Sequence, residues 1–284
     1  TYQISRMNID TTNAPNTTET AIGFIPCYRL PFVSLYNEDC IETMKRIPDG
    51  SIDLMLTDPP YNTTNCDWEY EINLQQLWFE WERILKPNGV WAIFCNEPFT
   101  SDLIMSRRGF FKYKWIWDKD SAASFLNAYK MPLTGYEEIV IFSRAKMGNH
   151  TYNPQITDKA KNLVRPPKTD GKEYSATYNK FKSLSREKDT SKAFPKNIIT
   201  IGKNEAECNS LNRFHPTQKP TDLMRYLILT YSNKGEKVFD GYSGSGTTAE
   251  ACMIEQRNFI GSELNKEYFD KSVLRLKNVP QSLF

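Results

Sequence analysis

Several features that mark large classes of protein are missing from this sequence of 284 residues. No apolar run reaches the roughly 18 residues that a membrane-spanning helix needs, so we expect no membrane partner. No signal-peptide pattern opens the chain, which argues against secretion. The sequence starts with Thr1 rather than Met, from which we expect a trimmed chain.

Histidine is rare and cysteine is scattered. The chain has 2 histidines and 6 cysteines, and no Cys-x-x-Cys pair occurs in it. Structural metal sites are built from Cys and His ligands at short, regular spacing, so we expect no metal centre. Reduced thiols in a cytoplasmic protein fit this pattern best.

Charge is unevenly distributed along the chain. Residues 144–213 hold 15 Lys and Arg against 7 Asp and Glu, a net charge of +8, so the rest must carry −6 to give the total of +2. Such a basic segment suggests a polyanionic partner, and a solvated insertion without a partner is the alternative. Aromatic residues interleaved with the basic ones favour nucleic acid. These aromatics are Tyr152, Tyr174, Tyr178, Phe181 and Phe194.

Outside this segment, strand-like and helix-like patterns alternate. We expect strands at 33–36, 52–58, 90–95, 113–117, 139–142, 237–240 and 259–262, and helices at 41–47, 73–85, 97–108, 222–231 and 247–256. This alternation is typical of an α/β fold with a mostly parallel sheet and helices on both faces. Residues 1–30, rich in Thr, Asn and Pro, are predicted to form a flexible arm.

The most informative motif is Asp58-Pro59-Pro60-Tyr61, which directly follows a buried, strand-like run. Its prolines fix φ and remove two N–H donors, so neither a strand nor a helix continues through them. The expected result is a stiff corner that presents a carboxylate, a free carbonyl and an aromatic face to one point. Such groups can grip a flat heterocycle that bears an exocyclic amine. An ordinary proline-rich turn is the alternative.

A second motif, Phe239 to Thr248, reads as a strand, a glycine loop and the start of a helix. Glycines let a ligand approach the backbone closely, and a helix N-terminus offers free N–H groups. Glu263 follows the next expected strand, where its carboxylate could accept both hydroxyls of a ribose. The loop lacks the third glycine of the dinucleotide fingerprint and the chain has no P-loop, which disfavours NAD and ATP. A dinucleotide site or a purely structural turn stays open.

These two motifs and the segment His215-Pro216-Thr217-Gln218-Lys219-Pro220 together resemble the S-adenosylmethionine-dependent DNA amino-methyltransferases. The tetrapeptide precedes the glycine loop by 182 positions, an order similar to that of the circularly permuted beta class. The resemblance covers about residues 33–275. It implies a Rossmann-like fold with a catalytic half at 31–143, a target-recognition insertion at 144–213 and a cofactor half at 214–284. It also implies a prokaryotic or phage-encoded enzyme.

The resemblance assigns roles to particular residues. The catalytic corner would be Asp58, Pro59, Pro60 and Tyr61. S-adenosylmethionine would be bound by Asp39, Cys40, Thr217, Lys219, Pro220, Asp240, Tyr242, Gly244, Gly246, Thr247 and Glu263. Within this set, Asp39 and the Cys40 backbone would contact the adenine moiety, and Lys219 would close the pocket near the methionine tail. His215 is expected at a helix entry without a catalytic role.

The chain departs from the family pattern at two places. The glycine loop carries Asp240-Gly241-Tyr242 where the family commonly has Asp-Pro-Phe, so Gly241 loosens the turn. The segment Pro132 to Glu138 resembles the family's Pro-Leu-x-x-His-Glu pattern but has Tyr136 in place of the histidine. A proton-handling role at that position is therefore in doubt, and Tyr136 is either a second wall for the target base or part of the core.

The predicted activity is methyl transfer from S-adenosylmethionine to the N6 amine of an adenine flipped out of duplex DNA. In the resembling family, Asp at the first motif position usually accompanies adenine and Ser usually accompanies cytosine, so cytosine N4 is the alternative. A methyltransferase acting on RNA or protein, a DNA-binding module with an inactive pocket, and an NAD oxidoreductase are further alternatives. The sequence leaves open whether the enzyme is a homodimer and whether a cognate restriction endonuclease accompanies it.

Overall fold

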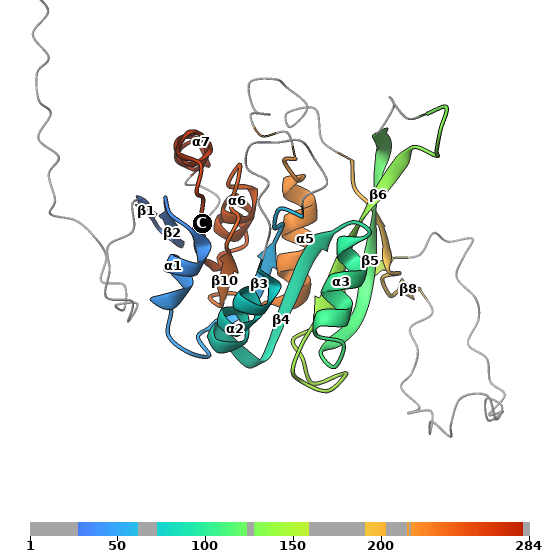
Figure 1. Ribbon diagram of the computed structural model, residues 1–284, viewed down its shortest axis with the longest axis horizontal. Helices are drawn as coiled ribbons and strands as arrows, with labels where there is room; N and C mark the ends of the chain where they lie inside the picture. The colour runs from blue at the N-terminus through green and yellow to red at the C-terminus, as the bar shows by residue number, and fades with distance from the viewer. Residues whose placement is uncertain are drawn as a thin grey trace, which may run out of the picture.

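The computed structural model describes residues 28–61, 73–123, 128–158, 191–202, 215 and 217–280. The strands of its main sheet are β1 (Tyr28–Leu30), β2 (Val33–Tyr36), β3 (Ile52–Thr57), β4 (Leu85–Cys95), β5 (Phe111–Ala123), β6 (Thr134–Phe142), β9 (Ile198–Thr200), β10 (Lys237–Asp240) and β11 (Asn258–Ser262). They lie in the order β1-β2-β11-β10-β3-β4-β6-β5-β9 (Figure 1). A separate pair is formed by β7 (Thr157–Asp158) and β8 (Lys192–Ala193).

The centre of the sheet is parallel. Strands β2, β11, β10, β3 and β4 run in the same direction, whereas β6 is antiparallel to β4 and to β5. The prediction of a mostly parallel sheet is therefore confirmed. Because β6 runs in the opposite direction, its first residues lie beside the carboxyl end of β4, where Glu138 is opposite Cys95. This reversal brings part of β6 to the edge at which the parallel strands end.

Helices cover both faces of the sheet, as predicted. On one face lie α1 (Cys40–Lys45), α2 (Leu74–Ile84) and α3 (Phe99–Ser106), and their apolar side chains share a buried cluster with Met55 and Trp91. On the other face α5 (Thr221–Tyr231), α6 (Thr247–Ile254) and α7 (Lys266–Lys277) share a second cluster with Leu54 and Leu56. Successive residues of β3 thus point to opposite faces, so a strand buried on both sides reads as one continuous apolar run.

Several elements differ from the sequence prediction. Residues 28–30, assigned to the flexible arm, form β1 and pair with β2, while residues 1–27 lie outside the described residues. Helix α7 and strand β9 were not predicted. Strands β5 and β6 are longer than expected because they pair with each other, up to Ala123 opposite Thr134. Residues 118–123 are polar or small, so their sequence shows no apolar strand pattern.

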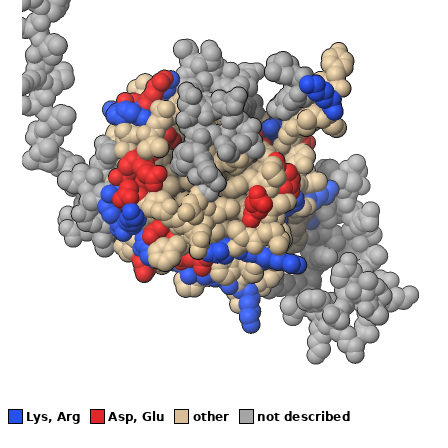
Figure 2. Space-filling view, viewed as in Figure 1, with Lys and Arg blue, Asp and Glu red and all other residues tan. Residues whose placement is uncertain are grey.

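Most of the predicted recognition insertion is outside the described residues. Of its 15 Lys and Arg, 11 lie at 159–190 and 203–213, as do Tyr174, Tyr178 and Phe181. The described part contributes β9, which pairs with β5 in the main sheet, so this part of the segment belongs to the core fold. Tyr152 and Phe194 are 40% and 66% exposed. On the face shown in Figure 2, the described acidic and basic side chains are interspersed. None of the described helices is long and apolar enough to cross a membrane.

Candidate active site

The predicted motifs meet at the carboxyl edge of the parallel strands. Asp58 follows β3, Asp240 ends β10, and Glu263 follows β11. In open α/β sheets this edge is where ligands bind. The antiparallel β6 adds Glu137 to the same edge, because its first residues lie beside the end of β4.

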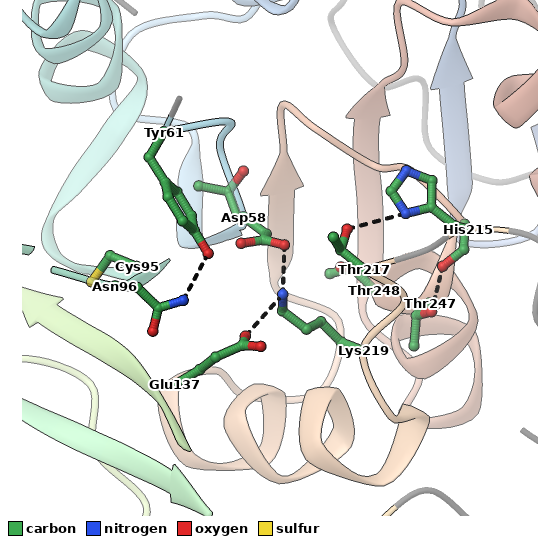
Figure 3. Close-up of polar contacts among 12 residues, drawn as sticks. Asp58, Tyr61, Cys95, Asn96, Glu137, His215, Thr217, Lys219, Thr247 and Thr248 are labelled. Atoms are coloured by element: carbon green, nitrogen blue, oxygen red, sulfur yellow. Dashed lines mark hydrogen bonds and ion pairs between the residues drawn. The ribbon is translucent and has the colours of Figure 1, made fainter. Parts of the chain in front are cut away.

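A chain of alternating charges surrounds Asp58 (Figure 3). Lys219 Nζ donates to Asp58 Oδ2 at 2.6 Å and lies 3.1 Å from Glu137 Oε2. The other oxygen of Glu137 accepts from Lys119 Nζ at 3.3 Å. The Lys219 ammonium also lies 5.0 Å from the centroid of the Phe94 ring. Lys219 was predicted to close the methionine end of the cofactor pocket, and the structure places its ammonium on Asp58, the carboxylate predicted to be catalytic.

Burial and charge compete in setting the ionisation of this group. Burial raises the pKa of Asp58, and Lys219 offsets part of that rise. Burial alone would lower the pKa of Lys219, but the carboxylates of Asp58 and Glu137 outweigh it and raise the pKa above its ordinary value. Burial alone would raise the pKa of Glu137, but the charges of Lys219 and Lys119 outweigh burial and lower the pKa of this carboxyl. Lys219 is therefore cationic and Glu137 anionic near neutral pH.

The second oxygen of Asp58 has no such neighbour. Oδ1 is buried and makes no hydrogen bond to any of the described residues. A buried acceptor without a donor costs roughly 1–3 kcal/mol, more when it is charged. Such an atom is expected where a ligand completes the hydrogen bond, and an N–H group of an exocyclic amine would do so.

Tyr61 stands beside this carboxylate, at the end of the proline corner. Its ring stacks on Phe99, with centroids 5.4 Å apart and planes at 15°. Its hydroxyl accepts from Asn96 Nδ2 at 3.2 Å (Figure 3). Burial raises the pKa of Tyr61, so the phenol is neutral. Pro59 is buried and Pro60 is half-buried. Stacking and the amide hydrogen bond fix the orientation of the aromatic face.

The Asp240 side chain accepts hydrogen bonds that connect the glycine loop to its neighbours. Its Oδ1 accepts from the Thr57 hydroxyl at 2.9 Å and from the Tyr242 N–H at 3.1 Å, and its Oδ2 accepts from the Thr248 hydroxyl at 2.7 Å. Burial raises the pKa of Asp240 to about 6. Through these three hydrogen bonds Asp240 ties β3, the glycine loop and α6 together. Its predicted contact with the cofactor stays a prediction.

The loop itself needs two glycines. Gly244 has φ +49° and Gly246 has φ +73°, in the left-handed region that favours glycine. A Cβ on Gly246 would lie 3.0 Å from the Cβ of Ser272. The N–H of Gly244 donates to Glu263 Oε2 at 2.8 Å, which connects the glycine loop to the carboxylate predicted to hold a ribose.

The other predicted cofactor residues lie around this loop. The His215 ring packs near Gly244 and against Tyr268, and its Nδ1 is 3.2 Å from the Thr217 hydroxyl. Burial lowers the pKa of His215 to about 4, so the ring is neutral. The Thr247 hydroxyl contacts Ser245 and Arg275. Thr247 is thus engaged within the chain.

Of the remaining predicted residues, three lie at the starts of helices and Tyr242 lies in the glycine loop. Asp39 caps α1 by accepting from the Ile41 N–H at 2.7 Å, and Cys40 is buried behind it. Pro220 is the N-cap of α5. Tyr242 is half-buried and packs on the cluster that holds α1. The structure therefore brings the catalytic corner and Lys219 into direct contact, and it places Asp39 on a different segment of the same edge.

Sequence reasoning missed four residues of the site. Glu137, Lys119, Asn96 and Phe99 all contact the catalytic corner or its partners. A signal existed for Glu137, because it lies in the segment Pro132 to Glu138 that resembles a family motif. Asn96 follows the end of β4, a position at which polar side chains reach the ligand edge.

Comparison with protein families gives a match over most of the chain. A model of the DNA methylase family (N6_N4_Mtase) matches residues 52–274. The DNA adenine methyltransferase YhdJ of Escherichia coli (strain K12) is 31% identical over 257 residues, 86% of this chain and 82% of that protein. The type II methyltransferase M1.MboII of Moraxella bovis is 30% identical over 264 residues, 84% of this chain and 94% of that protein.

Solved structures give the same fold. The crystal structure of the M1.HpyAVI-SAM complex aligns with a TM-score of 0.55 at 25% identity, covering 85% of this chain and 98% of that chain. The PvuII DNA methyltransferase, described as cytosine-N4-specific, aligns with a TM-score of 0.58 at 20% identity, covering 88% of each chain. At that identity the second likeness shows the fold alone. The predicted Rossmann-like fold is confirmed.

Proposed function

This chain belongs to the DNA methylase family, and on that premise we propose that it methylates the N6 amine of an adenine flipped out of duplex DNA. It is an S-adenosylmethionine-dependent DNA methyltransferase. The carboxylate at Asp58 and the relative named as a DNA adenine methyltransferase support adenine. Cytosine N4 is the second candidate, because a cytosine-N4-specific enzyme has the same fold.

The observation that carries the proposal is the buried Oδ1 of Asp58, which makes no hydrogen bond to the described residues. The lone pair of an exocyclic amine is delocalised into the ring, which makes the nitrogen a poor nucleophile. Asp58 Oδ1 and the Pro59 carbonyl would each accept one N–H and draw the nitrogen toward tetrahedral geometry. When bound, S-adenosylmethionine supplies an electrophilic methyl group on a sulfonium.

The reaction is an in-line displacement, which depends mainly on positioning. The nitrogen–carbon bond forms as the carbon–sulfur bond breaks, and the electron pair of that bond stays on sulfur. The methylated nitrogen then carries a positive charge and loses one proton, which the Asp58 carboxylate can accept. Asp58 therefore has to be ionised when the base arrives.

The glycine loop fits the cofactor. The left-handed φ values of Gly244 and Gly246 give the loop its tight turn, and the buried Ser243 hydroxyl has no hydrogen-bond partner among the described residues. Each oxygen of Glu263 already accepts one backbone N–H, from Gly244 or Asn265, and has a lone pair left for a ribose hydroxyl. We infer that the loop holds the methionine and Glu263 the ribose.

Transfer of labelled methyl groups tests the function. Duplex DNA, RNA and protein are each incubated with the chain and labelled S-adenosylmethionine, and base-resolution sequencing then locates the modified base. We expect label in duplex DNA at adenine N6. Label at cytosine N4 would replace the base assignment, and label in RNA or protein alone would overturn the proposal.

Tyr61→Ala should weaken capture of the flipped base. Stacking on an aromatic side chain is worth about 1–3 kcal/mol per base, so we expect a loss of roughly 5- to 150-fold. A fluorescent base analogue at the target position reports capture, because its emission rises when it leaves the stack. Tyr61→Phe is the matched control: it keeps the stacking face and loses only the hydrogen bond to Asn96, so it should capture the base far better than the alanine variant. Equal fluorescence with the alanine variant would contradict the role.

We also infer that residues 144–213 bind the DNA backbone as the recognition insertion, between a catalytic half at 31–143 and a cofactor half at 214–284. Each phosphate contact made by Lys or Arg adds about −0.9 to the slope of log affinity against log salt. Replacing four of the basic residues at 159–190 by Gln should flatten the slope by up to about 4. Four replacements outside the segment are the control, and an unchanged slope would place the DNA elsewhere.

A homodimer, a cognate restriction endonuclease and a cytoplasmic location stay predictions. Relatives include proteins named as type II methyltransferases and one named as an orphan methyltransferase. These names are compatible with a methyltransferase that has a cognate restriction endonuclease and with one that has none. Light scattering at several chain concentrations measures the oligomeric state.

A further inference from the structure

We propose that Lys219 and Glu137 are positioning residues that set the orientation and the charge of Asp58, with Lys219 acting directly and Glu137 acting through Lys219. The inference rests on the proposed function, because it concerns the carboxylate that accepts the amine. It gives Lys219 a role different from the predicted contact with the cofactor.

The geometry fixes the plane of the carboxylate. Lys219 holds one oxygen of Asp58 at 2.6 Å and leaves the other for the substrate (Figure 3). A carboxylate is rigid and planar, so holding Oδ2 also determines the position of Oδ1. The side chains of Lys219, Asp58 and Glu137 are 8%, 21% and 15% exposed, so solvent screens their interaction only weakly.

The charges explain why two partners are needed. Without a cation, burial would raise the pKa of Asp58 further and favour its protonated form, in which the free acceptor becomes a donor or a neutral oxygen. If Lys219 were the only charged neighbour, its ammonium would offset more of the negative charge of Asp58, and the carboxylate would accept a hydrogen bond from an amine less strongly. Glu137 takes part of the lysine's charge, and Lys119 compensates Glu137 in turn.

Other titratable groups face Asp58, and they do not supply this function. Tyr61 and Cys95 have raised pKa values through burial and are neutral. Asp240 interacts with Asp58 through space but binds Thr57, Tyr242 and Thr248.

The pH dependence of kcat tests the proposal because the two variants have opposite effects. Methyl transfer needs ionised Asp58, so kcat rises with pH through the pKa of that carboxyl. We call this rise of kcat with pH the acidic limb of the profile. Lys219→Gln removes the cation and should move the limb to higher pH by about 1–3 units. Glu137→Gln removes an anion that disfavours ionisation of Asp58, and should move the limb downward by up to about one unit.

Three comparisons make the test specific. Lys219→Arg keeps the charge and should return the limb toward that of the unmodified chain. Glu138→Gln is the matched control: Glu138 neighbours Glu137 but pairs with Lys114, so the limb should not move. Binding of S-adenosylmethionine, measured by calorimetry, should change less than threefold in Glu137→Gln.

The result that overturns the proposal is a fall in kcat with an unmoved limb in both glutamine variants, which would show a purely structural role. Shifts in the same direction would overturn it as well. If Lys219→Gln does not fold, the other two variants decide the question. The limb should then move to lower pH in Glu137→Gln and stay near that of the unmodified chain in Lys219→Arg. Failure of the proposed function is distinguishable, since the unmodified chain would then not methylate adenine at all.

Discussion

Asp58→Ala should reduce methyl transfer by about 100- to 1,000-fold, the loss typical of removing one preorganised polar group from a reacting centre. In the proposed mechanism the buried Oδ1 of Asp58 accepts an N–H of the amine and so localises its lone pair, and this oxygen has no hydrogen-bond partner among the described residues. The Pro59 carbonyl alone cannot take both N–H groups in the required directions. Single-turnover transfer of labelled methyl to target duplex, with cofactor bound in excess, measures the chemical step directly.

The control is Asp58→Asn, which keeps the shape and one carbonyl oxygen. When the oxygen of the introduced amide faces the substrate, its NH2 group faces the Lys219 ammonium. Both of these groups are donors, so the hydrogen bond to Lys219 is lost. We therefore expect an intermediate loss for Asn and the full loss for Ala. Cofactor affinity should be retained in both variants, because the cofactor loop is held by Asp240. Turnover near the normal rate in Asp58→Ala would contradict the mechanism.

The overall fold was predictable because its strands are buried on both faces. β3 is a continuous apolar run whose residues alternate between two cores, and a run of this kind followed by a helical repeat indicates a parallel α/β sheet. The sites at the strand ends were predictable for a related reason. Parallel strands all end at one edge, so Asp58, Asp240 and Glu263 had to lie near one another once the strand assignments were correct.

Side-chain pairing could not be predicted in the same way. Lys219 and Asp58 are 161 positions apart, and no periodicity in the sequence indicates which carboxylate a buried ammonium will contact. Glu137 depends on the reversal of β6, which follows from how β4 and β6 pair rather than from the composition of either strand. The β5–β6 hairpin extends through polar residues, which in sequence are indistinguishable from a loop.

Asp240→Ala should destabilise the protein and abolish cofactor binding together. The substitution leaves the Thr57 hydroxyl, the Thr248 hydroxyl and the Tyr242 N–H without their acceptor in a buried site. Each orphaned group costs about 1–3 kcal/mol, so the free energy of unfolding should fall by about 3 kcal/mol or more. For a domain of this size that corresponds to a decrease in Tm of roughly 6–12 °C. Thermal unfolding and calorimetric binding of S-adenosylmethionine measure the two effects.

Asp240→Asn separates the scaffold role from direct contact with the cofactor. Its remaining oxygen can still accept from Thr57 and Tyr242, and its amide can donate to Thr248, since a hydroxyl can rotate to accept. Stability should therefore be nearly normal in Asn and low in Ala. If Asp240 acts mainly by touching the cofactor, both variants should lose affinity while the Tm stays unchanged. A fall in Tm restricted to Ala, with affinity lost in parallel, is the result that identifies the carboxylate as the support on which the glycine loop is built.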